Sequence, residues 1–205
     1  MKLYILLAAV FLFAGCQKRG SIGLSSTASS GGACLFDGQS NAAQMDMEYV
    51  RKTLGCQTVN IAVGDTSLAQ HIKGGEFYAN LIATLKQLMK RGPVIYVFYQ
   101  GEWEGKNAIG HDTWNQRFTE HIQNIRTESG LTSMPVYFFR INEHRYDQYP
   151  AYAWEKVRDE QDGVHVQSTT MISSDGCELS HDELHYTTDG YHCLTDRLAS
   201  EIRGE

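Results

Sequence analysis

The sequence predicts a single α/β domain, built as a three-layer α/β/α sandwich around a five-stranded parallel sheet. Five short, mostly apolar runs alternate with five segments whose apolar residues have helical spacing, as in strands joined by helical crossovers. Two of the runs, Val94–Tyr99 and Val136–Phe139, are continuously apolar, which is typical of strands buried on both faces. Right-handed crossovers between parallel strands then place helices on both faces of the sheet.

The predicted elements follow one another in regular alternation. Strands are expected at Ala33–Phe36, Thr58–Val63, Val94–Tyr99, Val136–Phe139 and Val164–Gln167, and helices at Ala42–Leu54, Phe77–Arg91, Thr113–Ser129, Ala151–Gln161 and Thr188–Arg203. Gly92 and Gly130 close two of the helical stripes, as C-terminal glycines do. Ligands of such folds bind beyond the carboxyl ends of the strands, so we expect a site in the loops at that edge.

The first residues have the order of a secretory signal peptide, which we assign to residues 1–15. Lys2 is followed by an apolar run that is too short to span a membrane and then by small residues. The residues before Cys16 resemble a bacterial lipobox, which implies cleavage there and lipidation of the Cys16 thiol, although Phe13 stands where leucine is commonest. The alternative is an uncleaved N-terminal anchor. Both interpretations place the domain in the cell envelope, on the periplasmic or extracellular side.

The remainder divides into a tether and a domain. Residues 16–32 are rich in Ser and Gly and are predicted to be flexible, and residues 33–205 form the domain. The formal net charge is −6 and no basic run follows the tether, so nucleic acid is not expected as a partner. No residues have zinc-ligand spacing, so we expect no metal and no cofactor. The sequence leaves the oligomeric state open.

A serine occupies the first predicted turn between a strand and a helix, in Gly38-Gln39-Ser40-Asn41. Unpaired backbone N–H groups at a helix start favour developing negative charge. One turn can therefore supply both a nucleophile and part of an oxyanion hole. The alternative is that Ser40 or Asn41 merely caps the helix.

Four short blocks occur in order across the domain. They are Gly38-Gln39-Ser40-Asn41, Ala62–Ser67, Tyr99-Gln100-Gly101-Glu102 and Asp182-Glu183-Leu184-His185. Together they resemble the blocks of the SGNH (GDSL-like) hydrolases, particularly the branch of carbohydrate acetylesterases that includes sialate O-acetylesterases and acetylxylan esterases. The resemblance implies a serine esterase that removes acetyl groups from sialate, xylan or peptidoglycan through an acyl-enzyme.

The resemblance assigns Ser40 as the nucleophile, His185 as its general base and Asp182 as the residue that orients the imidazole. The chemistry agrees, because a serine hydroxyl needs a base such as neutral imidazole to remove its proton. Asp189 and His192 repeat the same D-x-x-H spacing seven residues later. We prefer the first pair, because the glycine and tyrosine inside the second match residues that follow the catalytic histidine in family members.

The resemblance also implies an oxyanion hole. The backbone N–H groups of Ser40 and Gly64 would donate to it, and a glycine allows the close approach that this role needs. Many relatives add an asparagine side chain, which this chain lacks at that point. We assign the third donor to the Gln100 amide, because an ionised Glu102 would repel an oxyanion. Glu102 is assigned to substrate binding, through a sugar hydroxyl, with a loop-fixing role as the alternative.

Residues that could select the substrate are less distinctive. Arg140 ends a strand at the predicted site and is assigned to binding a substrate carboxylate, with a structural ion pair as the alternative. Five aromatic residues near the site could stack on sugar rings or pack in the core: Trp103, Trp114, Tyr149, Tyr152 and Trp154. Competing functions are a lipid or thioester hydrolase of the same fold and a catalytically silent carbohydrate-binding surface lipoprotein.

Four cysteines follow Cys16, and in an oxidising compartment an even set suggests disulfides. Three pairings are possible. We expect Cys34–Cys56, near the starts of two predicted neighbouring strands, together with Cys177–Cys193, which would staple the segment that contains the predicted catalytic pair.

Overall fold

The computed structural model describes residues 32–205, so the predicted signal peptide, Cys16 and the tether up to residue 31 lie outside the described part. The strands are β1 (Ala33–Gly38), β2 (Gln57–Asn60), β3 (Val94–Tyr99), β4 (Val136–Arg140) and β5 (Thr169–Ser173). The helices are α1 (Ser40–Ala43), α2 (Met47–Leu54), α3 (Leu68–His71), α4 (Tyr78–Leu88), α5 (Glu102–Asn107), α6 (Trp114–Ser129), α7 (Ala151–Asp162) and α8 (Thr188–Arg203). Within this range no helix is long and apolar enough to cross a membrane.

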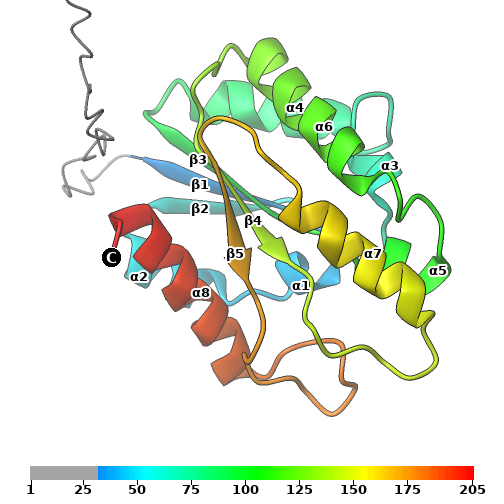
Figure 1. Cartoon of the computed structure of the whole chain (residues 1–205). Coiled ribbons are helices and arrows are strands. Elements are labelled where there is room, and N and C mark those ends of the chain that lie inside the picture. The colour runs from blue at the N-terminus through cyan, green and yellow to red at the C-terminus, as the bar shows by residue number, and fades with distance from the viewer. Residues whose placement is uncertain (1–31) are drawn as a thin grey trace, which may run out of the picture.

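All five strands are parallel and lie in the order β2-β1-β3-β4-β5. Helices α2 and α8 pack together on one face of the sheet, and α4, α6 and α7 cover the other (Figure 1). The predicted three-layer sandwich with a five-stranded parallel sheet is therefore confirmed. The carboxyl ends of β1 and β3 meet in the middle of the sheet, where the first and third sequence blocks follow them.

The centre of the sheet forms the core. Leu35 and Phe36 of β1 and Tyr96 and Phe98 of β3 are fully buried. Phe118 stacks on Phe98 with ring centroids 5.1 Å apart, which attaches α6 to the sheet. Truncating one such buried aromatic residue typically costs about 3–5 kcal/mol, so this packing fixes the strand ends that hold the site.

The predicted helix Ala42–Leu54 is two helices, α1 and α2. The Asp46 side chain accepts hydrogen bonds from the backbone N–H groups of Glu48 and Tyr49, both at 3.0 Å, and so starts a new helix. The short helices α3 and α5 were not predicted, because four and six residues are too few to show an apolar periodicity.

The fifth strand was predicted at Val164–Gln167 and lies instead at Thr169–Ser173. Arg126 of α6 donates to the carbonyl oxygens of Gln167 at 2.8 Å and Ser168 at 2.9 Å, and Ser168 has a left-handed φ of 54°. These residues therefore form a turn, and pairing with β4 begins only at Thr169.

Both predicted disulfides are present. Cys34–Cys56 joins β1 to the residue before β2, and Cys177–Cys193 joins the loop after β5 to α8. The paired residues are 22 and 16 positions apart, for which chain entropy gives a stabilisation of about 3 kcal/mol each. The second bridge closes the loop that contains Asp182 and His185.

Candidate active site

Ser40 lies at the carboxyl end of β1, directly after a tight turn. Gly38 has a φ of 120°, and a Cβ there would lie 2.1 Å from the Tyr99 carbonyl oxygen, so only glycine fits. The N–H of Gln39 donates to the same oxygen at 2.9 Å. Ser40 is then the first residue of α1, and Gln39 occupies the N-cap without a side-chain capping bond. Neither Ser40 nor Asn41 caps this helix, so the capping alternative is wrong.

The structure brings Ser40, His185 and Asp182 into one hydrogen-bonded series. His185 Nε2 lies 2.9 Å from Ser40 Oγ, and His185 Nδ1 lies 2.6 Å from Asp182 Oδ2. A carboxylate at Nδ1 keeps the hydrogen on that nitrogen, which leaves the Nε2 lone pair facing the serine. This is the geometry that general-base activation of a serine requires.

The loop around Asp182 holds its carboxylate in the ionised form. Asp182 Oδ1 accepts hydrogen bonds from Ser180 Oγ at 2.7 Å and from the N–H groups of Leu184 and His185 at 3.1 and 2.9 Å. Partial burial would raise the pKa of Asp182, but the bonds from Ser180, His185 and the backbone hold that pKa well below its usual range. Asp182 is therefore ionised in the folded protein.

The second D-x-x-H pair does not reach the serine. The His192 ring stacks on Tyr49 with centroids 3.8 Å apart, and its Nε2 lies 3.2 Å from an Asp46 carboxylate oxygen. Asp189 lies in the first turn of α8, as the sequence indicates. The geometry therefore favours Asp182 and His185 over the alternative pair.

Asn41 connects the loop that contains His185 to the rest of the site by hydrogen bonds. Its Nδ2 donates to Glu102 Oε1 at 2.8 Å and to the Leu184 carbonyl at 3.3 Å, while its Oδ1 accepts from the Tyr191 hydroxyl at 3.1 Å. Both amide hydrogens are thus used, one on α5 and one on the residue before His185. The fourth residue of the first block therefore connects the segment of Ser40 to α5 and to the residue before His185.

A cavity of about 180 Å³ opens over Ser40 and His185. It is lined by Gln39, Ser40, Asp65, Glu102, Trp103, Lys106, Tyr149, Leu184 and His185. Of the five aromatic candidates, Trp103 and Tyr149 line this cavity, Trp114 and Trp154 are buried in the core, and Tyr152 is 65% exposed. Lys106, which the sequence did not single out, lies 3.8 Å from Asp65 and over the Tyr149 ring.

Two backbone N–H groups lie at and beside Ser40. Within residues 32–205, the N–H groups of Ser40 and Gly64 have no hydrogen-bond partner. A Cβ on Gly64 would lie 3.7 Å from the Ser40 Cβ, so the two residues are direct neighbours. This arrangement agrees with the predicted oxyanion donors, whose role stays a prediction.

Gln100 requires a correction. Its side chain is fully buried and does not line the cavity. Its Nε2 donates to Glu104 and lies 3.4 Å from acceptors on Gln39 and Thr66, while its Oε1 accepts from the Trp114 indole at 2.9 Å. With both ends of the amide committed to the interior, Gln100 cannot serve as the third oxyanion donor.

Gln39 is the amide that the sequence reading missed. Its Oε1 accepts from the backbone N–H of Trp103 at 3.2 Å. A backbone N–H can only donate, so the oxygen must be the atom on that side, and the Nε2 hydrogens are left without a partner among residues 32–205. Gln39 lines the cavity beside Ser40. The contacts that distinguish it from Gln100 are tertiary ones, with Trp103 for Gln39 and with Trp114 and Glu104 for Gln100, and the sequence does not reveal them.

Glu102 lines the cavity but is only 3% exposed. Its Oε1 holds Asn41, and its Oε2 is buried with no partner in the described part of the chain. Burial raises the pKa of Glu102 to about 7, against the opposing effect of the Asn41 bond. The predicted sugar contact stays a prediction, and the bond to Asn41 agrees with the loop-fixing alternative.

We expect Glu102 to make folding stability depend on pH. Its pKa is raised from the ordinary value of 4.5 to about 7 in the folded protein. The stability that the buried, protonated carboxyl provides is therefore fully present below about pH 4.5 and is lost as the pH rises through about 7. Glu102→Gln, which cannot ionise, should therefore gain about 2–3 kcal/mol in free energy of unfolding relative to the wild type between pH 5 and pH 8. Urea titrations of both proteins at pH 5 and pH 8 measure this difference in free energy of unfolding.

Burial also raises the pKa of Glu104, but Glu104 is present in both proteins, so its effect cancels in the difference. An equal difference at both pH values would contradict the raised pKa.

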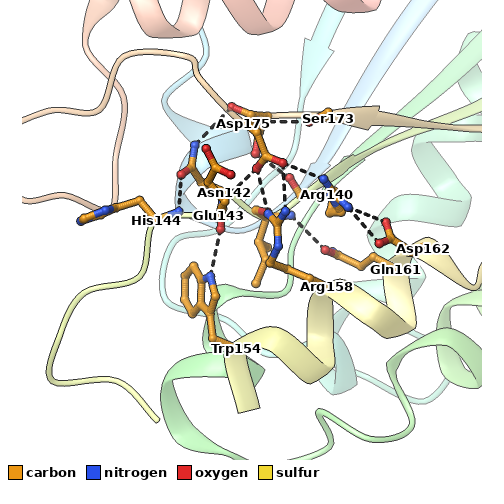
Figure 2. Close-up of polar contacts among 12 residues, drawn as sticks. Arg140, Asn142, Glu143, His144, Trp154, Arg158, Gln161, Asp162, Ser173 and Asp175 are labelled. Atoms are coloured by element: carbon orange, nitrogen blue, oxygen red, sulfur yellow. Dashed lines mark hydrogen bonds and ion pairs between the residues drawn. The ribbon is translucent and has the colours of Figure 1, made fainter. Parts of the chain in front are cut away.

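Arg140 also requires a correction. Its guanidinium donates to Asp162 at 2.8 and 2.9 Å and to Asp175 at 2.6 Å, and Arg158 donates to the same Asp175 carboxylate at 2.8 and 2.9 Å. Figure 2 shows these groups converging where β4, α7 and the loop after β5 meet. The two arginines hold the pKa of Asp175 well below its usual range. Arg140 is therefore a structural ion-pair partner that anchors the start of the loop containing Asp182 and His185, and it is not available to a substrate.

Comparison with known proteins identifies the family of this chain. A family model described as carbohydrate esterase, sialic acid-specific acetylesterase, matches residues 38–203. The Arabidopsis thaliana protein named Probable carbohydrate esterase At4g34215 is 24% identical over 151 residues, which cover 73% of this chain and 55% of that protein. Its crystal structure superposes with a TM-score of 0.66 at 23% identity, covering 77% of this chain and 65% of that one.

Two further solved structures share the fold. The carbohydrate acetylesterase XAC1771 from Xanthomonas citri gives a TM-score of 0.64 at 15% identity, covering 84% of this chain and 57% of that one. A carbohydrate esterase family 3 protein from Talaromyces cellulolyticus gives 0.59 at 9% identity, covering 83% and 95%. The chain spans 55–65% of the length of the Arabidopsis relative. The family match covers most of the domain and confirms the resemblance to carbohydrate acetylesterases: the chain belongs to the family described as carbohydrate esterase, sialic acid-specific acetylesterase.

Proposed function

We propose that this protein is a serine esterase that removes O-acetyl groups from carbohydrate. The observation that supports this best is the unbroken series Ser40–His185–Asp182 at 2.9 and 2.6 Å, opening on a small cavity. Family membership supports the same reaction class.

In the proposed mechanism the substrate's acetyl carbonyl carbon lies against Ser40 Oγ. His185 Nε2 takes the serine proton as Oγ attacks, and Asp182 stabilises the imidazolium. The negative charge that develops on the carbonyl oxygen is met by the N–H groups of Ser40 and Gly64 and by the Gln39 amide. His185 then protonates the departing sugar hydroxyl, and water activated by the same imidazole releases acetate from the acyl-enzyme.

The cavity supports a small acyl group on a sugar. Its volume of about 180 Å³ suits acetyl rather than a long chain. Trp103 and Tyr149 at its wall offer faces on which a sugar ring can stack, and Glu102 offers a polar group near the scissile ester.

The proposal is tested by acetate release from acetylated sialosides, xylan and peptidoglycan, with Ser40→Ala as the control. Release from at least one of them by the wild type alone is expected. Hydrolysis of acyl-CoA or long-chain esters, with none of the three glycans deacetylated, would overturn the carbohydrate assignment in favour of a lipid or thioester hydrolase. Glycan binding without any hydrolysis would indicate a silent carbohydrate-binding protein.

We further propose a lipid anchor at Cys16, which would hold the esterase at the cell envelope. This proposal rests on the order of residues 1–16 in the sequence. Mass spectrometry of protein from a bacterial envelope fraction should find chains that begin at a diacylglyceryl-modified Cys16. An unmodified Cys16 in a secreted form would contradict the anchor and leave the esterase unaffected.

A further inference from the structure

Five polar side chains form a buried hydrogen-bonded cluster and take no part in the proposed triad. They are Asp37, Thr66, His71, Tyr96 and His121, none of them more than 4% exposed. They come from β1, the loop after β2, α3, β3 and α6. Burying a carboxylate and two imidazoles is costly unless their polar atoms are paired, so the direction of each hydrogen bond is informative.

Asp37 sits at the centre of this cluster and accepts hydrogen bonds. The N–H of Gly38 and the Nδ1 of His71 lie 2.7 and 2.9 Å from its Oδ1, and the Tyr96 hydroxyl lies 2.8 Å from its Oδ2. Burial alone would raise the pKa of Asp37, but the bond and charge of His71, with His121 and Tyr96, lower it below its ordinary value. Asp37 is therefore a carboxylate, and His71 carries a hydrogen on Nδ1.

On the side of Tyr96 and His121, the hydrogen bonds of the cluster also point toward Asp37. Tyr96 gives its one hydroxyl hydrogen to Asp37, so its oxygen accepts from His121 Nε2 at 3.0 Å. Burial lowers the pKa of His121 to about 4, which keeps that ring neutral. Its Nδ1, buried without a partner among residues 32–205, is then the bare nitrogen.

The near end of the cluster reaches the second sequence block. Thr66 Oγ1 lies 2.7 Å from the Val63 carbonyl oxygen. A carbonyl oxygen can only accept, so Thr66 donates its single hydroxyl hydrogen to it. Its oxygen must then accept from His71 Nε2, at 2.8 Å. Both ring nitrogens of His71 thus donate, one to Asp37 and the other to Thr66, and a continuous hydrogen-bonded relay joins Asp37, His71, Thr66 and Val63.

The relay ends on the peptide unit that contains the Gly64 N–H. The described residues contain no cis peptide bond, so the Val63 carbonyl and the Gly64 N–H point in opposite directions. Thr66 holds the Val63 carbonyl toward the buried cluster, so the Gly64 N–H points away from the cluster. Gly64 lies beside Ser40, and the preceding Val63 N–H is fixed by the Gly38 carbonyl at 2.9 Å.

We propose that His71 and Thr66 are positioning residues that hold the Val63–Gly64 peptide so that the Gly64 N–H points at the oxyanion of an acetyl-ester intermediate. Neither residue touches the substrate, and both act through the peptide. The inference rests on the proposed function of Ser40 as an ester nucleophile. A donor held in place before the reaction needs no reorganisation when charge develops, which is the source of its catalytic effect.

Thr66→Val tests the relay, because it removes the hydroxyl and keeps the branched shape, whereas Thr66→Ser keeps the hydroxyl. With p-nitrophenyl acetate, we expect Thr66→Val to lower kcat about tenfold or more with KM nearly unchanged, and Thr66→Ser to stay within about threefold of the wild type. Complete loss of one oxyanion donor costs about 10²–10³-fold, so a misdirected donor loses part of that.

A matched control separates this effect from lost stability. Thr195 of α8 is equally buried and donates to the Tyr191 carbonyl at 3.0 Å, within its own helix. Thr195→Val should lower the melting temperature as Thr66→Val does and leave kcat unchanged. A small boronic acid, which forms a tetrahedral anion on a reactive serine, should bind Thr66→Val more weakly than Thr66→Ser. If Thr66→Val does not fold, His71→Gln, which has one donor nitrogen in place of two and so cannot donate to both Asp37 and Thr66 as His71 does, should show the same loss in kcat and in boronic acid affinity.

The outcomes distinguish the two proposals. Equal kcat and equal boronic acid affinity in Thr66→Val and Thr66→Ser, with Ser40→Ala inactive, would overturn the relay and leave the esterase standing. A fully active Ser40→Ala would overturn the esterase mechanism itself. Loss of kcat in Thr195→Val as large as in Thr66→Val would also overturn the relay, because the effect would then be one of stability.

Discussion

Ser40→Ala is expected to lower kcat for p-nitrophenyl acetate by about 10⁴–10⁶-fold, because it removes the group that forms the acyl-enzyme. The residual rate would come from substrate binding and the oxyanion donors alone. The Ser40 hydroxyl makes its side-chain hydrogen bond to His185, so its loss should leave the fold intact. Steady-state kinetics and thermal unfolding of the same preparation measure both expectations.

The two D-x-x-H pairs provide the matched control. His185→Ala should be about as inactive as Ser40→Ala, because residues that act as one unit are not additive. His192→Ala removes an imidazole that contacts Tyr49 and Asp46 instead, so it should keep most of the activity. An inactive His192→Ala together with an active His185→Ala would contradict the assignment of the base.

Much of the fold could be predicted because its central strands are defined by local composition. Val94–Tyr99 has the predicted bounds, since a continuous apolar run starts after Pro93 and ends at a polar residue. The fifth strand could not be predicted in the same way. Its start depends on Arg126, which lies far away in the sequence and occupies the carbonyl groups of Gln167 and Ser168. Such a tertiary contact leaves no signal in the local sequence.

The same distinction between local sequence and tertiary contacts applies to the residues of the site. Ser40, Asp182 and His185 come together because the first block ends the central strand β1 and the last block lies in the loop that leads to α8. The positions of Gln100 and Arg140 depend instead on what surrounds them. The Trp114 indole draws Gln100 into the interior, and Asp162 and Asp175 neutralise Arg140. The sequence shows that an amide and a guanidinium are near the strand ends, but it does not show which way they point.

Gln39→Ala is expected to lower kcat by about 10²–10³-fold, the usual effect of losing one oxyanion-hole donor. KM should change little, because the amide bonds to the oxygen mainly in the transition state. The prediction rests on the fixed orientation of the Gln39 amide. The Trp103 N–H donates to its Oε1, which leaves Nε2 free to donate into the cavity that Gln39 lines. Steady-state kinetics on p-nitrophenyl acetate measure kcat and KM separately.

Two variants make this test specific. Gln39→Glu keeps the shape and the acceptor for Trp103 but replaces the donor with a carboxylate, so it should be at least as slow as Gln39→Ala. Gln100→Ala removes the partners of Trp114 and Glu104 in the core, so its main effect should be a lower melting temperature, because buried polar groups are left unpaired. Normal kcat in Gln39→Ala would contradict the assignment. Because one amide lies in the cavity and the other in the core, the kinetic loss and the stability loss should fall on different variants.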